Sequence, residues 1–194
     1  SRYASAKDAY AFWYDLVMSF GLGATFNTDI PSEVSGNIPK SSYYEKLYRG
    51  VWNALTIRSL SIGQGEILVT PLQLANMAAA IGNEGFYYPP HLLRAFSDDT
   101  PLDSVMTTKK IIDIKSKHFK DVKKGMCRVF EGDHGTARFS KIDSIQVAGK
   151  TGTAENPHGD DHSLFMGFAP VDNPQIAIAV VVENAGFGSQ WAAP

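Results

Sequence analysis

The chain has 194 residues, of which 44% are hydrophobic and 20% charged, a balance that fits one globular domain with a sizeable core. A formal net charge of −2 gives no reason to expect nucleic acid or an anionic membrane surface as a partner. The single cysteine, Cys127, excludes an internal disulfide and a metal site built from several cysteines. No apolar run approaches the roughly 20 residues that a membrane-spanning helix needs.

The first 42 residues predict one helix followed by a loop. Apolar residues recur at helical spacing over residues 6–20, and Gly21 would end the helix. Segment 21–42 is rich in Gly, Pro, Asn and Ser, which is typical of turns. We expect the helix to bury a stripe formed by Ala9, Phe12, Trp13, Leu16, Val17 and Phe20.

A sharper helix signal begins at Thr70. Thr70, Pro71 and Gln73 form a capping box with proline at the first helical position. The segment that follows is apolar nearly all round, so we expect a buried helix that ends at residues 83–85. Just before it, Gly63-Gln64-Gly65 lacks the third glycine of a dinucleotide-binding loop, and we interpret it as a turn.

The middle of the chain predicts a short strand and an amphipathic helix. Residues 111–114 read "IIDI", and residues 116–130 place Phe119, Val122, Met126 and Val129 on one helical face. The many lysines between 109 and 124 could form a binding patch, but the near-neutral total charge favours a solvated surface.

Three strand-like segments end the chain. They read "SIQVAGKT", "SLFMGFAP" and "PQIAIAVVVEN", and short turns separate them. Strands that follow several helices in this way predict an α+β domain with an antiparallel sheet.

The segment Lys150-Thr151-Gly152-Thr153 carries the clearest chemistry. A lysine can attract a carboxylate or tune a nearby nucleophile, threonine hydroxyls can bind a carboxylate, and glycine admits a neighbouring backbone. A free strand edge also offers backbone groups to an extended ligand. Residues 150 and 153 should face opposite sides of a regular strand. They can share one cleft only if the strand twists or bulges, or if both side chains lean past an edge.

Several stretches together resemble the transpeptidase domain of penicillin-binding proteins, class B, elongation type. They match in order along nearly the whole chain, and the ones at 61 and 148 are the most specific. The stretches are "SFGLG" (19–23), "SGNIP" (35–39), "SIGQGEILVTPLQLANMAAAIGNEG" (61–85), "GTARF" (135–139), "AGKTGTAENPHGDDHSLFMGFAP" (148–170) and "VENAGFG" (182–188).

The resemblance implies a penicillin-binding, serine β-lactamase-like fold with residues 150–153 on the strand that lines the cleft. Lys150 would shape the field around the nucleophilic serine. The hydroxyls of Thr151 and Thr153 would meet the carboxylate of substrate or antibiotic. The Thr153 N–H would be an oxyanion-hole donor, and Gly152 would allow close approach.

The other two motifs of the family, S-x-x-K and S-x-N, are not found at their expected places in this chain. No lysine of the chain has a serine three positions before it, so S-x-x-K is absent. Ser35-Gly36-Asn37 matches S-x-N, but it lies in the "SGNIP" stretch, which follows the true motif in the family. We therefore expect residues 1–194 to be one partial transpeptidase domain. The nucleophile and the true S-x-N would lie upstream of Ser1, and a covering helix beyond Pro194.

The resemblance implies that the full protein is a serine D,D-transpeptidase that cross-links peptidoglycan stem peptides and is acylated by β-lactams. The chain as given would then be inactive alone. No cofactor, metal or nucleic acid is implied. A membrane-anchored parent with this domain on the extracytoplasmic side would work with cell-wall elongation proteins. A serine β-lactamase or β-lactam sensor, and a non-catalytic peptide- or partner-binding module, remain alternatives.

Two further candidates are histidine-based. His158, Asp160, Asp161 and His162 could bind a metal, but their loop lacks the tight ligand spacing of zinc sites, and a role in shaping the cleft rim is favoured. His134 could be a general base, although a histidine in a surface turn is the simpler interpretation.

Overall fold

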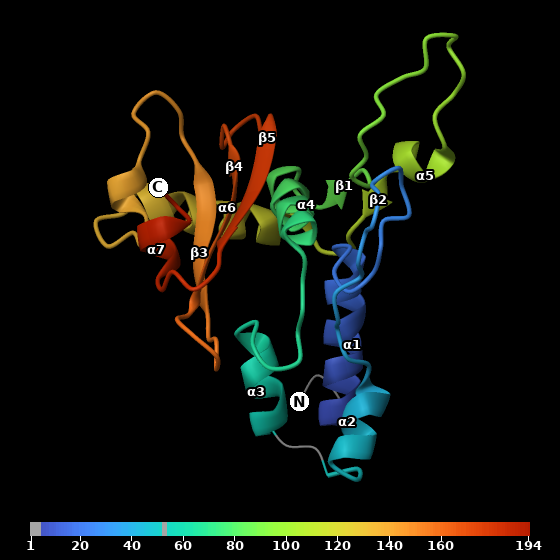
Figure 1. Ribbon diagram of the computed structural model, residues 1–194, viewed down its shortest axis with the longest axis vertical. Helices are drawn as coiled ribbons and strands as arrows, with labels where there is room; N and C mark the ends of the chain where they lie inside the picture. Colours follow the sequence, from blue (N-terminus) through green and yellow to red (C-terminus); the bar gives the residue numbers. More distant parts are fainter. Residues whose placement is uncertain (1–4, 52–53) are drawn as a thin grey trace.

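The computed structural model describes residues 5–51 and 54–194. Three helices, α1 (Ala6–Ser19), α2 (Ser41–Leu47) and α3 (Ala54–Ser61), lie at one end of the molecule (Figure 1). The sheet of β3, β4 and β5 lies at the other end, with α4 beside it. The fold is therefore a mixture of helices and antiparallel sheet, and the predicted α+β class is confirmed. None of the helices in the described ranges is long and apolar enough to span a bilayer.

Helix α1 forms where the periodicity predicted it, with Ser5 as its N-cap. Its most buried residue is Tyr10, whose hydroxyl donates a 2.5 Å hydrogen bond to the carbonyl of Pro39. Tyr10 packs against Tyr44 of α2 and Leu60 of α3. The prediction that Phe12 belongs to the buried stripe is wrong, because that ring is 42% exposed. The neighbouring helices cover the side of α1 that carries Tyr10 instead.

Helix α4 (Pro71–Gly82) has the predicted capping box, in which the Thr70 hydroxyl and the Gln73 amide each bond the other's backbone. It is a buried helix, as expected, and two of its buried residues are polar. The Gln73 side chain donates to the carbonyls of Ala24 and Ser35, both at 2.9 Å. Asn76 donates to the Phe20 carbonyl at 2.8 Å. Helix α4 thereby holds the long loop after α1, since it satisfies the backbone carbonyls of that loop.

The predicted strand at 111–114 forms only in part. Strand β2 (Lys110–Ile111) pairs with β1 (Phe86–Tyr87), and a short helix α5 (Ser104–Thr107) lies between them in sequence. Helix α6 (Ser116–Glu131) follows as predicted. Its buried residues are Phe119, Met126 and Phe130, whereas Val122 is 47% exposed. Val122 was therefore wrongly assigned to the packed face.

Strands β3 (Ala148–Ala154), β4 (His162–Ala169) and β5 (Ile176–Val182) form an antiparallel sheet in the order β3-β4-β5. Side chains alternate between its two faces. One face carries Phe168 and packs on α4 and α6, while the other carries Phe165 and packs on Phe130. The 3-10 turn η1 (Arg138–Ser140) and helix α7 (Gly188–Trp191) lie beside the second face. On β5, Ile176 and Ile178 remain exposed.

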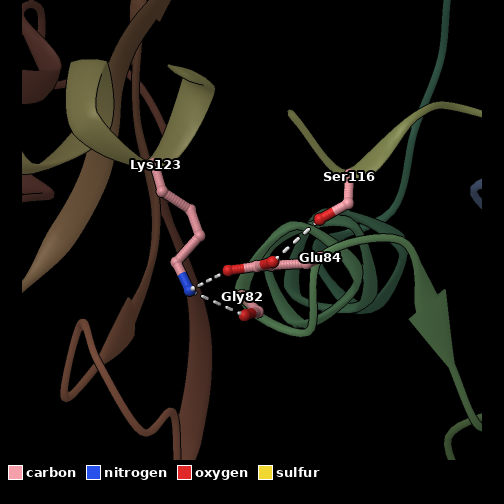
Figure 2. A network of polar contacts seen from close by, with 4 residues as sticks. All are labelled: Gly82, Glu84, Ser116 and Lys123. Atoms are coloured by element: carbon pink, nitrogen blue, oxygen red, sulfur yellow. Dashed lines mark hydrogen bonds and ion pairs between the residues drawn. The ribbon is translucent and has the colours of Figure 1, made fainter. Parts of the chain in front are cut away.

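One of the lysines expected on the solvated surface, Lys123, connects two helices of the fold. Figure 2 shows that Lys123 of α6 reaches the end of α4, where its Nζ donates to the Gly82 carbonyl at 3.2 Å and lies 3.4 Å from a Glu84 oxygen. Glu84 also accepts a 3.0 Å hydrogen bond from the Ser116 hydroxyl. The other lysines between 109 and 124 are exposed, which agrees with the solvated interpretation.

Candidate active-site cleft

A cleft of about 520 Å³ runs along the edge of β3. All four residues of the segment 150–153 line it. Strand β3 is the outer strand of its sheet, so the backbone edge beside the cleft has no neighbouring strand within the described residues. An extended ligand can therefore pair with this edge.

The edge also explains how Lys150 and Thr153 share one cleft. Residues 148–154 pair one-to-one with residues 168–162 of β4, with no extra residue on either strand, so β3 has no bulge. Lys150 and Thr153 thus project from opposite faces, and both line a cleft that wraps the free edge. The register therefore excludes a bulge, and side chains that lean past the free edge fit it.

Thr151 and Lys150 each form a hydrogen bond with another group of this chain. Thr151 is 7% exposed, and its hydroxyl lies 2.8 Å from the hydroxyl of Thr136, which precedes η1. The ammonium of Lys150 donates to the carbonyl of Thr151. Among the described residues that line the cleft, Lys150 is the only charged one, so the cleft attracts anions.

The loop after β5 forms the second wall. The N–H of Gly188, at the start of α7, lies 3.5 Å from the Thr153 hydroxyl. An added Cβ at Gly188 would lie 2.2 Å from the Gly152 carbonyl oxygen, so α7 can pack this close only with glycine there. The buried hydroxyl of Ser163 donates to the Gly186 carbonyl at 2.8 Å and fixes the loop on β4. These contacts hold the Thr153 side chain in place.

Four lining residues were not singled out from the sequence: Ile62, Thr136, Phe187 and Ser189. All of them lie in or next to stretches of the family resemblance, at 61–85, 135–139 and 182–188. Those stretches were the signal that could have found them. Ile62 and Phe187 are 70% and 62% exposed, so they give the cleft an apolar rim.

The remaining candidates lie elsewhere. Ser35 and Asn37 line a separate cleft of about 420 Å³, and the Asn37 amide donates to the Glu66 carbonyl at 2.8 Å. His134 is exposed in the turn after α6. Within residues 5–51 and 54–194 no three His, Cys, Asp or Glu side chains gather as a metal site. His162 instead accepts the Asn184 N–H at its Nδ1, at 3.1 Å.

The model of the penicillin-binding protein transpeptidase domain matches residues 7–194 of this sequence. The chain belongs to this family. Curated relatives include the peptidoglycan D,D-transpeptidases MrdA of Haemophilus influenzae, 34% identical over 193 residues, and of Escherichia coli K12, 30% identical over 187 residues. These alignments cover 90% and 87% of this chain but 30% of each relative. The chain therefore spans about a third of their length.

Solved structures agree with the family. The crystal structure of Pseudomonas aeruginosa PBP2 in complex with WCK 5153 has a TM-score of 0.82 and 38% identity, over 93% of this chain and 41% of that one. A complex between PBP2 and MreC from Helicobacter pylori gives a TM-score of 0.73 and 26% identity, over 94% and 35% of the two chains. The expected penicillin-binding fold is confirmed. The MrdA relatives confirm the class B, elongation-type assignment.

Proposed function

We propose that this chain forms one wall of the active site of a serine D,D-transpeptidase that cross-links peptidoglycan stem peptides. The observation that carries the proposal is the cleft at the free edge of β3, lined by Lys150, Thr151, Gly152 and Thr153. Family membership supports the same reading, since the MrdA relatives are named D,D-transpeptidases.

In the proposed reaction, a serine outside this chain attacks the D-Ala-D-Ala end of a stem peptide. An acyl-enzyme forms, the terminal D-alanine leaves, and an amine of a neighbouring stem peptide then displaces the serine. Lys150 supplies positive charge beside the nucleophile and the substrate carboxylate. The hydroxyls of Thr151 and Thr153 bond that carboxylate, the Thr153 N–H is one donor to the oxyanion, and Gly152 lets the substrate backbone approach. β-Lactams acylate the same serine.

The proposal extends to the setting of the parent protein. It is anchored in the cytoplasmic membrane, holds this domain on the extracytoplasmic side, and works with elongation partners. The PBP2–MreC complex from Helicobacter pylori supports a partner of that kind. The 194-residue chain alone lacks the nucleophile and is inactive.

Intact-mass analysis after incubation with penicillin tests this assignment. We expect no added mass on the 194-residue chain and one stable adduct on the full-length parent. In the parent, Lys150→Ala should slow adduct formation. A stoichiometric adduct on the unmutated chain, lost in Lys150→Ala, would place the nucleophile in this chain and refute the proposed division of the site.

The same measurement separates the alternatives. Rapid loss of the adduct from the parent would indicate a β-lactamase, because such enzymes hydrolyse the acyl-enzyme. A parent that never gains mass, and whose coding sequence upstream of Ser1 has no S-x-x-K, would be a non-catalytic binding module.

A further inference from the structure

The Ser35-Gly36-Asn37 segment, which the proposed active site does not use, lines a cleft of about 420 Å³. This cleft lies at the helical end of the molecule, where α1 and α2 contact each other (Figure 1). Tyr14 of α1 and Tyr43 of α2 also line it. The cleft therefore brings two aromatic side chains from different helices to one face of the loop between those helices.

The loop that lines this cleft is held in place from outside it. The backbone N–H and carbonyl of Asn37 pair with the carbonyl and N–H of Leu68 at 2.7 and 2.9 Å. The carbonyl of Pro39 accepts the 2.5 Å hydrogen bond from the Tyr10 hydroxyl. A ligand thus meets a loop whose shape is already set, which lowers the entropy cost of binding. These backbone groups are also engaged, so they offer no edge to an extended peptide.

The cleft instead offers aromatic surface and polar side-chain groups. Tyr43 is 45% exposed, and its ring packs edge-on against Tyr44 with the centroids 5.1 Å apart. Lys40 is the only charged residue among the described lining residues, and its ammonium makes no ion pair within the described part of the chain. The Asn37 side chain donates to the Glu66 carbonyl at 2.8 Å, which leaves its oxygen to accept from a ligand. A fitting ligand is therefore neutral or anionic, with apolar faces and a polar rim.

We propose that this cleft binds a carbohydrate, with a sugar ring stacked on Tyr43 and its polar groups bonded to Lys40 and Asn37. A pyranose combines C–H faces with a rim of hydroxyl groups, so one ring can use both the aromatic surface and the side-chain partners. A proline-rich peptide also suits tyrosine rings, but its side chains carry nothing that bonds Lys40 or Asn37. That the carbohydrate is the glycan strand of peptidoglycan rests on the function proposed above.

The carbohydrate cleft and the cleft along β3 share one supporting segment. Glu66 and Leu68, which hold Asn37, lie a few residues after Ile62, which lines the cleft along β3. A glycan at Asn37 and a stem peptide at β3 would thus rest on opposite ends of the same short stretch of chain. The two sites are nevertheless lined by different residues, so each can be tested without changing the other.

Saturation-transfer NMR on the full-length parent tests the inference, with tri-N-acetylchitotriose as the carbohydrate and decaproline as the competing ligand class. We expect the trisaccharide to bind, and Tyr43→Ala to weaken its affinity about threefold to tenfold. Tyr43→Phe keeps the ring and should bind within about twofold of wild type. Lys40→Met should weaken binding about twofold to fivefold. Tyr88→Ala removes a tyrosine that is 50% exposed outside the cleft and should have no effect.

A thermal melt of each variant shows that a loss of binding is not a loss of folding. Absence of saturation transfer to the trisaccharide would overturn the inference, and so would transfer that Tyr43→Ala and Lys40→Met leave unchanged. Binding of decaproline alone, lost in Tyr43→Ala, would replace the carbohydrate with a proline-rich peptide.

Penicillin labelling of the wild-type parent separates this inference from the proposed function. A parent that gains the penicillin adduct but binds no trisaccharide would overturn the carbohydrate cleft and leave the proposed transpeptidase intact. A parent that binds the trisaccharide through Tyr43 but gains no adduct would support the cleft and refute the proposed function.

Discussion

Replacing Lys123 with methionine should destabilise the protein more than the same replacement of any other lysine between residues 109 and 124. The ammonium lies 3.2 Å from the Gly82 carbonyl and 3.4 Å from Glu84, and 5.8 Å from the centre of the Phe168 ring. The side chain is only 13% exposed, whereas that of Glu84 is 34% exposed. A charged hydrogen bond at a helix C-terminus, together with a partly screened ion pair, contributes about 1–2 kcal/mol. We expect Lys123→Met to lower the free energy of unfolding by that amount.

Urea unfolding followed by circular dichroism measures this difference, with Lys120→Met as the matched control. Lys120 lies on the same helix and is exposed, so its replacement should change the free energy by less than about 0.5 kcal/mol. A double-mutant cycle with Glu84→Gln isolates the ion pair, which should account for about 0.2–1 kcal/mol of the loss. Equal losses in the two lysine variants would refute the role assigned to Lys123.

The pH dependence gives a second check on the same contacts. The Ser116 hydrogen bond, followed by the charge of Lys123, lowers the pKa of Glu84 below its ordinary value of 4.5. The folded state therefore favours the ionised carboxylate, and its contribution to stability is present above pH 4.5. That contribution should disappear as the pH falls through the lowered pKa, so wild type and Glu84→Gln should converge in acid.

Three further predictions concern other contacts. Gly188→Ala should lower the free energy of unfolding by about 1–3 kcal/mol, because the new Cβ meets carbonyl oxygens of β3 and β4. Gly125→Ala is the contrasting case, since its added Cβ has no atom within 4 Å, and it should raise the free energy of unfolding by about 0.5–1 kcal/mol. Thr136→Val should cost about 1 kcal/mol in a urea titration, since it leaves the buried Thr151 hydroxyl without its 2.8 Å partner; no loss would mean that this contact does not form in solution. Burial raises the pKa of Tyr10 from 10.0 to about 12, so stability should fall by about 2–3 kcal/mol as the pH rises from 10 to 12, and Tyr10→Phe should flatten that fall.

Elements with strong local signals could be predicted from the sequence. The capping box at Thr70 and the apolar period of residues 116–130 each depend on contacts within a few residues, and both helices formed as expected. Helix α2 was missed because its seven residues lack a side-chain cap at Lys40, and packing of Tyr44 against Tyr10 holds it in place. A contact between residues so far apart in sequence leaves no local pattern.

The candidate site likewise contains residues that the sequence predicted and residues that it did not. Residues 150–153 formed a recognisable motif, and they line one cleft. Thr136 and Phe187 reach that cleft from segments on either side of β3 in sequence, so no spacing rule could place them there. Lys123 had the same sequence context as its solvated neighbours, and only the docking of α6 on α4 distinguishes it.

Helix α4 connects the segment that carries Ile62, on the rim of the cleft, to the sheet whose outer strand is β3. Residues 63–70 lead from Ile62 into its first turn, and Gln73 ties that turn to the loop after α1, while Lys123 ties its far end to α6 beside the sheet. The helix is about 18 Å long, so a tilt of about 5° would move one of its ends by roughly 1.5 Å relative to the other. A substitution at Glu84, which does not line the cleft, can thus shift Ile62 relative to β3. The geometry of the cleft therefore depends on residues that do not line it.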